Sequence, residues 1–201
     1  MNIATPFAFS GNETKEQKDL GALFVRFARK SHPKANIIQL SDMKTSEIEG
    51  IDSCYRAPME ALGLWYFDVM NDFQEREFLR VDYDCMIRAD VSEVFEYEFD
   101  IAIAKEDAKI MNNGVVFVRD REIYKYARKM YMENTGQDNW QDIQKAMSMA
   151  IDSGLFRVKR VPSEIYNYVY KRKEVAEKAK IVHFKGDRKV FMRPLFGHEA
   201  Y

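Results

Sequence analysis

The sequence has little of what marks disordered, fibrous or disulfide-stabilised proteins. Its 201 residues include nine Gly, five Pro and two Cys, which excludes collagen-like, low-complexity and small disulfide-rich classes. An excess of charge of one sign is also lacking, because 31 Lys and Arg stand against 32 Asp and Glu for a formal net charge of −1. A globally basic nucleic-acid-binding protein is therefore not expected.

Long apolar runs are missing as well. The uncharged apolar stretches fall far short of the roughly 20 residues that a membrane helix needs. The apolar stretch over 3–9 contains Pro6 and follows no basic segment, so we expect no signal peptide. Cys54 and Cys85 have no metal-like spacing. We expect a soluble, cytoplasmic protein with reduced thiols and no transmembrane segment, and its oligomeric state stays open.

The balanced total hides an uneven distribution of charge. Residues 42–107 contain 18 Asp and Glu against 6 Lys and Arg, whereas residues 157–193 contain 12 Lys and Arg against 4 Asp and Glu. These segments are either solvated faces or the two sides of a site that binds a cation and an anion together.

Apolar periodicity predicts alternating strands and helices in one domain over 1–201. We expect strands over 3–9, 36–40, 78–81, 99–104, 114–118, 155–161 and 181–184. We expect helices from the capping box at Thr14 to the residues before His32, from Pro58 to about Val69, and over 120–133, 138–152 and 171–179, with a helical turn over 91–95 and a loop over 41–56. This order favours an α/β fold with a mixed, mostly parallel sheet flanked by helices, whose ligands bind beyond the carboxyl ends of the strands.

Two strand ends have residues that suit a metal and a phosphate. Asp82 and Asp84 follow an apolar strand, and two carboxylates at this spacing point to the same side. A hard divalent cation between them would relieve their repulsion. His183 ends the last predicted strand and can add a nitrogen ligand for Mn²⁺, while Gly186 and Lys189 suit a phosphate. The alternatives are a solvated acidic loop and a buried histidine beside a basic turn.

The order of these motifs resembles the nucleotide-sugar glycosyltransferases of the GT-A fold, most closely glycosyltransferase family 8, the glycogenin and bacterial galactosyltransferase group. The similar stretches are 77–95 with its Asp-x-Asp, 112–117 with its Asn-x-Gly-Val, 161–167 with its Pro and Tyr-Asn, and 181–189 with its His-x-x-Gly-x-x-Lys. They cover roughly residues 57–191 in the same order. The resemblance implies a Rossmann-like nucleotide-diphospho-sugar transferase fold and a hexosyl- or pentosyltransferase that retains the configuration at the anomeric carbon.

The resemblance also implies the roles of individual residues. Asp82, Asp84 and His183 would hold Mn²⁺ or Mg²⁺, which would bridge to the diphosphate of the donor. The residues implied for donor binding are Thr5, Phe9, Arg56, Asp82, Asn112, Gly186 and Lys189. The acceptor would be a glycan, a lipid-linked sugar, a protein or a modified nucleic acid.

The chain departs from the family pattern at two places. Lys189 is followed by Val190 and Phe191 where the family has Pro and Trp. The family's Asp-Gln pair near the reacting sugar has no clean counterpart, and Gln141 with Asp142 is the nearest match, which implies these two as the catalytic residues.

Three other functions use similar elements. A sugar-1-phosphate nucleotidyltransferase needs a Gly-rich, basic loop after its first strand, and residues 10–13 are a poor substitute. A haloacid-dehalogenase-like phosphatase has its Asp-x-Asp near the N-terminus, whereas here it lies mid-chain. A non-catalytic nucleotide-sugar-binding module stays open, although the intact motifs disfavour it.

A basic face of the first helix, formed by Arg26, Arg29, Lys30 and Lys34, either compensates the helix dipole or contacts an anionic acceptor.

Overall fold

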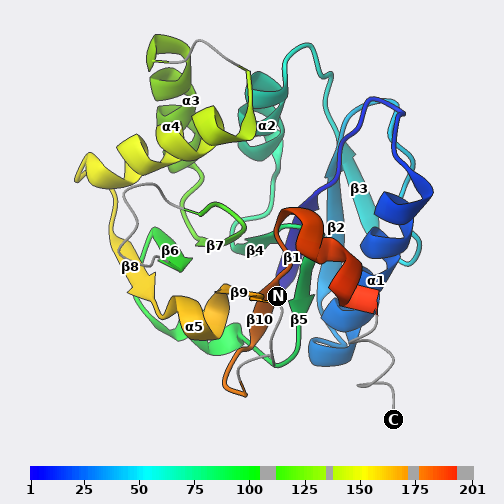
Figure 1. Ribbon diagram of the computed structural model, residues 1–201. Coiled ribbons are helices and arrows are strands. Elements are labelled where there is room, and N and C mark those ends of the chain that lie inside the picture. The colour runs from blue at the N-terminus through cyan, green and yellow to red at the C-terminus, as the bar shows by residue number, and fades with distance from the viewer. Residues whose placement is uncertain (105–111, 135–137, 172–176, 194–201) are drawn as a thin grey trace.

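The protein is built on a seven-stranded mixed sheet (Figure 1). The structure is a computed structural model that describes residues 1–104, 112–134, 138–171 and 177–193. The strand order is β3-β2-β1-β4-β7-β6-β8. The strands span β1 (Asn2–Pro6), β2 (Asn36–Ser41), β3 (Ser53–Arg56), β4 (Phe78–Val81), β6 (Ile101–Ala104), β7 (Val115–Val118) and β8 (Val158–Val161). Neighbours pair in parallel except that β7 runs antiparallel to both β4 and β6, which confirms the predicted mixed, mostly parallel sheet.

A second, three-stranded sheet lies beside the first, in the order β5-β10-β9. It consists of β5 (Cys85–Ile87), β9 (Tyr168–Val169) and β10 (Ile181–His183). Residues 82–84 connect β4 of the large sheet directly to β5 of the small one. This short connection therefore lies where the two sheets meet.

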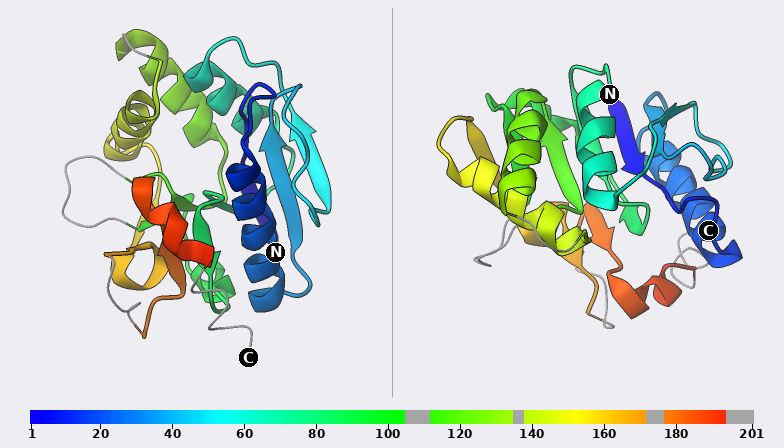
Figure 2. Two further views of the ribbon diagram at one scale, coloured as in Figure 1. Left: turned by 45° about the vertical axis from the view of Figure 1, so that its right-hand side comes forward. Right: turned by 90° about the horizontal axis from the view of Figure 1, so that it is seen from above.

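Helices cover both faces of the large sheet (Figures 1 and 2). The helices are α1 (Lys15–Ser31), α2 (Leu62–Asp72), α3 (Glu122–Asn134), α4 (Trp140–Asp152) and the short α5 (Ser163–Tyr166), with 3₁₀ turns η1 (Ser92–Glu96) and η2 (Gly186–Phe191). One core packs α1 and the small sheet against the large sheet, and the other packs α2, α3 and α4 against the opposite face. Alternating strand residues feed the two cores: Leu79 lies in the first and Phe78 in the second.

Local signals explain the ends of some helices and long-range contacts explain others. The predicted capping box begins α1, with Thr14 and Gln17 bonded to each other's backbone N–H groups. In contrast, α2 begins at Leu62 and not at Pro58, because the Asp138 carboxylate accepts hydrogen bonds from the N–H groups of Leu62 (2.6 Å) and Gly63 (2.7 Å). That cap comes from a distant part of the chain, which a local pattern does not reveal.

Several predicted boundaries need correction. The expected loop over 41–56 contains β3 at its end, and the predictions omitted β5, α5, β9 and η2. The strand expected over 155–161 begins at Val158. Most of the helix expected over 171–179 lies outside the described residues, and its described ends are turn or irregular backbone. Among the described helices, none is long and apolar enough to span a membrane.

Candidate functional site

A cavity of about 390 Å³ opens at the carboxyl ends of β1 and β4. The wall is formed by the loops after these strands, the turn before β7, the starts of α2 and α4, the end of β10 and η2. The lining residues include Phe9, Leu62, Trp65, Arg80, Asp82, Tyr83, Asp84, Asn113, Trp140, Gln144, His183, Gly186 and Lys189. The site thus lies at the sheet edge that the α/β pattern predicted.

The two predicted carboxylates face this cavity from the connection between the sheets. Asp82 donates its backbone N–H to the Gly114 carbonyl (2.9 Å), which extends the pairing of β4 with β7. Asp84 accepts a backbone hydrogen bond from Phe184 (2.9 Å). The Asp84 side chain is buried, whereas Asp82 is partly exposed. Backbone pairing with both sheets therefore fixes the carboxylates from two sides.

His183, the last residue of β10, joins them. Its Nε2 lies 3.3 Å from Asp84 Oδ1 and 3.8 Å from Asp82 Oδ2. Its Nδ1 lies 3.0 Å from Oδ1 of the buried Asn167. Because an amide oxygen only accepts, Nδ1 carries a ring proton, and Nε2 is the ring nitrogen that faces the carboxylates.

A glycine makes room for this ring. A Cβ atom on Gly114 would lie 2.2 Å from Cε1 and 2.5 Å from Nδ1 of His183. Real Cβ atoms do not approach other heavy atoms so closely. The Gly of the Asn-x-Gly-Val stretch is therefore required by the position of the histidine.

Asp84 and His183 can present ligand atoms to a divalent cation, and Asp82 Oδ2 lies 3.8 Å from the same imidazole nitrogen. Asp84 Oδ1 is buried and has no hydrogen-bonded partner in the part of the chain that the structure describes, although Nε2 faces it. A cation bound by both residues would give this buried oxygen a partner. Cys85 also lies near Asp84 and His183, but burial raises the pKa of its thiol. The neutral thiol is a poor ligand for Mn²⁺ or Mg²⁺, so the oxygen and imidazole ligands suit the site better.

Two cations balance the two carboxylates. The guanidinium of Arg80 lies 2.6 Å from Asp82, and the Lys189 ammonium lies 3.0 Å from Asp84. Burial acts to raise the pKa of Asp84, but His183 and Lys189 outweigh it and lower that pKa to about 2. Burial likewise opposes the charge of Lys189, yet Asp84 and the Tyr83 hydroxyl raise its pKa. Asp84 is therefore a carboxylate at neutral pH.

Aromatic rings form one side of the cavity. Phe7, Phe9 and Tyr83 contact each other edge to face, with centroids 4.9 to 5.9 Å apart. The buried Asp42 anchors this side, because its carboxylate accepts backbone hydrogen bonds from Phe9 and Ser10, both 3.0 Å. Phe9 was predicted to bind the donor and does line the cavity. Asp42 escaped the sequence analysis because its partners lie far along the chain.

Three other residues predicted to bind the donor have their side chains elsewhere. Thr5 is fully buried within β1. Arg56 donates from Nη1 to the carbonyls of Asp42 (2.8 Å) and Thr45 (2.7 Å), so it braces the turn after β2. Asn112 Oδ1 accepts from the N–H of Gly114 (2.9 Å), and the adjacent Asn113 lines the cavity instead. Gly186, in contrast, lies at the cavity with a φ of 62°, a conformation that favours glycine.

The predicted catalytic pair lies on α4 next to the cavity without lining it. Gln141 is exposed, and the buried Asp142 pairs with Lys145 (3.2 Å). Trp140 and Gln144 line the cavity instead. Residues four apart share one helix face, so this spacing was the pattern that could have identified them. The catalytic role of Gln141 and Asp142 stays a prediction.

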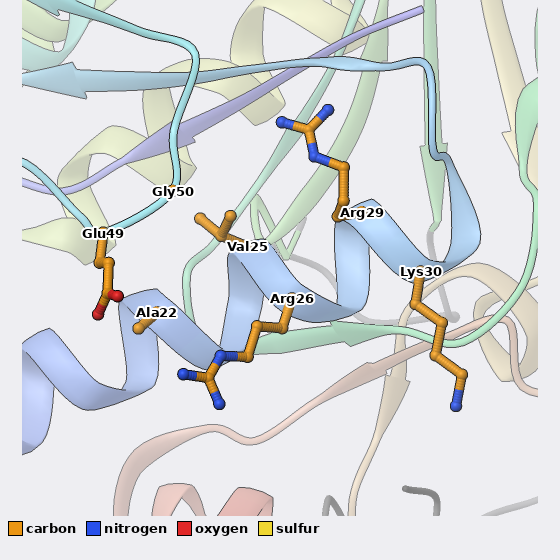
Figure 3. Close-up of a pocket in the computed structure, with 7 residues that line it drawn as sticks. All are labelled: Ala22, Val25, Arg26, Arg29, Lys30, Glu49 and Gly50. Atoms are coloured by element: carbon orange, nitrogen blue, oxygen red, sulfur yellow. The ribbon is translucent and has the colours of Figure 1, made fainter.

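A second hollow, of about 450 Å³, lies against the basic face of α1. Its basic side chains point in different directions (Figure 3). Arg29 is already engaged, with Asp52 at 2.7 Å and the Ala35 carbonyl at 2.7 Å. Since the cations do not converge, the structure favours a solvated face over an anion site here.

The large mixed sheet, the small sheet and the carboxylate connection between them define the GT-A fold of nucleotide-sugar transferases. The galactosyltransferase LgtC, solved with donor and acceptor sugar analogues, superposes with a TM-score of 0.65 at 11% identity, over 98% of this chain and 96% of LgtC. A glycosyltransferase involved in glycosylation of the major capsid of PBCV-1 gives a TM-score of 0.63 at 15% identity, over 96% of this chain and 100% of that one.

A third similar structure is the glycosyltransferase GlyE of Streptococcus pneumoniae TIGR4, with a TM-score of 0.61 at 11% identity, over 92% of this chain and 55% of GlyE. The sequence itself matches no protein-family model. It also matches no curated protein. The fold expected from the resemblance is thus confirmed by shape, at sequence identities that carry the fold alone.

Proposed function

We propose that this protein is a metal-dependent glycosyltransferase that moves a sugar from a nucleoside-diphosphate sugar to an acceptor hydroxyl group. The observation that carries the proposal is the convergence of Asp82, Asp84, His183 and Lys189 on one cavity at the carboxyl ends of the strands. The GT-A fold supports it, because similar structures are glycosyltransferases.

Different residues of the cavity would bind different parts of the donor. Asp82, Asp84 and His183 would hold Mn²⁺ or Mg²⁺, which as a Lewis acid stabilises negative charge on a diphosphate. Lys189 lies close enough to the carboxylates to contact a phosphate beside them, and the backbone at Gly186 can approach it closely. The aromatic side formed by Phe9 and Tyr83 suits a nucleobase.

The reaction requires stabilisation of a leaving group. The bond between the anomeric carbon and the diphosphate oxygen breaks, and its electron pair stays on the diphosphate. The acceptor oxygen forms the new glycosidic bond, and its proton passes to water or to the departing diphosphate. The ammonium of Lys189, fixed beside Asp84 in a half-buried place, is suited to neutralise the developing charge.

The finer assignments rest on the resemblance to family 8. It supports transfer with retention of a hexosyl or pentosyl group. The expectation of a cytoplasmic location rests on the two cysteines, which are both free thiols. The acceptor classes remain a glycan, a lipid-linked sugar, a protein or a modified nucleic acid. Trp140 supports a carbohydrate acceptor among these, because it is 43% exposed at the cavity rim and can stack on a sugar ring.

Nucleotide binding gives the first test. Melting curves are recorded with UDP, GDP and ADP, each with and without Mn²⁺. Mn²⁺ and the nucleotide that the protein binds should together raise the melting temperature. Release of the nucleotide from UDP-glucose, UDP-galactose and GDP-mannose is then measured with Mn²⁺.

Variants connect the activity to the cavity. Asp84→Asn should abolish nucleotide release, whereas Asp68→Asn, which removes a carboxylate paired with Arg128 on the surface, should not change it. The proposal is wrong if no nucleotide binds and no donor is hydrolysed. Pyrophosphate release from a nucleoside triphosphate and a sugar phosphate would identify a nucleotidyltransferase instead.

A further inference from the structure

A buried arginine forms part of the cavity wall directly beside the carboxylates. Arg80 is 1% exposed in the middle of β4, and Nη2 bonds Asp82. Its Nε and Nη1 are buried without a hydrogen-bonded partner within the described ranges. A buried donor without a partner costs roughly 1–3 kcal/mol, so such a group is expected to meet a ligand.

A buried acceptor lies on the same side of the sheet. Asn113, 3% exposed, donates from Nδ2 to the Tyr66 hydroxyl (2.8 Å), while its buried Oδ1 has no partner among the residues described. Arg80 lies over the ring of the same Tyr66, with its guanidinium carbon 5.4 Å from the centroid. Both residues line the cavity. The wall therefore holds buried donors and a buried acceptor that lack partners among the described residues, gathered around one tyrosine.

The backbone holds both residues in place before any ligand arrives. Arg80 lies on the central strand β4, where it is opposite Ala4 of β1 and Val116 of β7. Asn113 precedes β7 and is followed by Gly114, whose carbonyl bonds the backbone of Asp82. A site built on paired strands loses little entropy when it binds.

The chemistry of the free groups selects the ligand. A hydroxyl group can accept a hydrogen bond from Arg80 and donate one to the Asn113 oxygen. A carboxylate or phosphate could accept from Arg80, but its oxygens would repel the acceptor oxygen of Asn113. The charge of Arg80 is already balanced by Asp82, so no second anion is required. Leu62 and Trp65 complete an apolar wall, which suits the C–H face of a sugar ring.

We propose that Arg80 and Asn113 bind hydroxyl groups of the transferred sugar and thereby select an uncharged donor sugar. This inference rests on the proposed function. It assigns the sugar side of the cavity to two residues that the motif resemblance did not identify.

The test compares a nucleotide with its sugar conjugates, so that the sugar contribution is isolated. Calorimetric titrations with Mn²⁺ measure the Kd of UDP, UDP-glucose, UDP-galactose, UDP-xylose and UDP-glucuronate for the wild type. Arg80→Lys keeps a positive charge for Asp82 and removes the planar donors. It should weaken the preferred neutral UDP-sugar by about tenfold or more while UDP changes less than about twofold.

Further variants keep the test decisive. Asn113→Ala should give the same selective loss, and it replaces Arg80→Lys if that variant does not fold. Arg128→Lys, which changes an arginine paired with Asp68 outside the cavity, is the matched control and should change neither Kd.

The outcomes separate the inference from the proposed function. Equal weakening of UDP and the UDP-sugar would show that Arg80 only positions Asp82, which overturns the inference. A wild-type preference for UDP-glucuronate that Arg80→Lys removes would also overturn it. If the wild type binds UDP and no variant affects the sugar contribution, only the inference fails. If the wild type binds no nucleotide at all, the proposed function fails, and the inference fails with it.

Discussion

Replacing Gly114 by alanine tests whether the position of His183 controls metal binding. The new Cβ would lie 2.2 Å from the imidazole Cε1, and ordinary carbon contacts begin near 3.5 Å, so the ring must move by about 1.3 Å. That movement strains the 3.0 Å contact of Nδ1 with Asn167 and shifts Nε2 relative to the carboxylates. Misplaced ligands of this kind typically cost 10- to 100-fold in metal affinity.

The assay is a titration of Mn²⁺ in the presence of UDP, followed by calorimetry, together with a thermal melt. Overpacking should also lower stability by about 1–3 kcal/mol. Gly63→Ala is the matched control, because its Cβ would lie at the same 2.2 Å from a ring atom, that of Tyr131 between α2 and α3. The control should lose stability and keep its Mn²⁺ affinity. If both variants bind Mn²⁺ like the wild type, the proposed ligation by His183 is refuted.

Three further outcomes are expected. Asn167→Ala removes the acceptor that orients His183, so Mn²⁺ affinity should fall by about tenfold in the same titration, and stability should fall by about 1–3 kcal/mol because the buried ring N–H loses its partner. Hydrogen bonds to Asp42 outweigh its burial and lower its pKa from 3.8 to about 2. The ionised carboxylate therefore contributes about 2 kcal/mol to the free energy of unfolding above pH 4, and this contribution is lost as the pH falls toward 2. In denaturant titrations across this range, Asp42→Asn should lose this pH dependence of stability. Lys189→Met should lower the rate of nucleotide release by about 100-fold or more in the hydrolysis assay, and an unchanged rate would exclude a role for Lys189 in leaving-group stabilisation.

The sequence predicted the elements whose signals are local. Apolar strands such as β4 and β7, the capping box of α1 and the carboxylates at 82 and 84 were all identified from short patterns. It did not predict β3, an edge strand of four polar or half-buried residues, because such a segment has the composition of a loop. Nor could it place the start of α2, which is capped by Asp138.

The same distinction holds within the site. His183 and Lys189 were found because their motif is contiguous. Arg80 resembles an outward-facing polar residue in a short strand, and only the central position of β4 between β1 and β7 buries it. The choice between Asn112 and Asn113 depends on a turn in which one side chain caps the backbone and the other enters the cavity.

The connection between the two sheets also affects how the protein unfolds. Asp84 leads from β4 into β5, while His183 ends β10, so a ligand held by both residues joins segments roughly a hundred residues apart in the chain. Closing a loop of this length costs chain entropy, and folds rich in such long-range contacts fold slowly. A bound ion would link the two sheets and stabilise the native state, which would slow unfolding and proteolysis. The residues that would bind the donor would therefore also affect how long the native state persists.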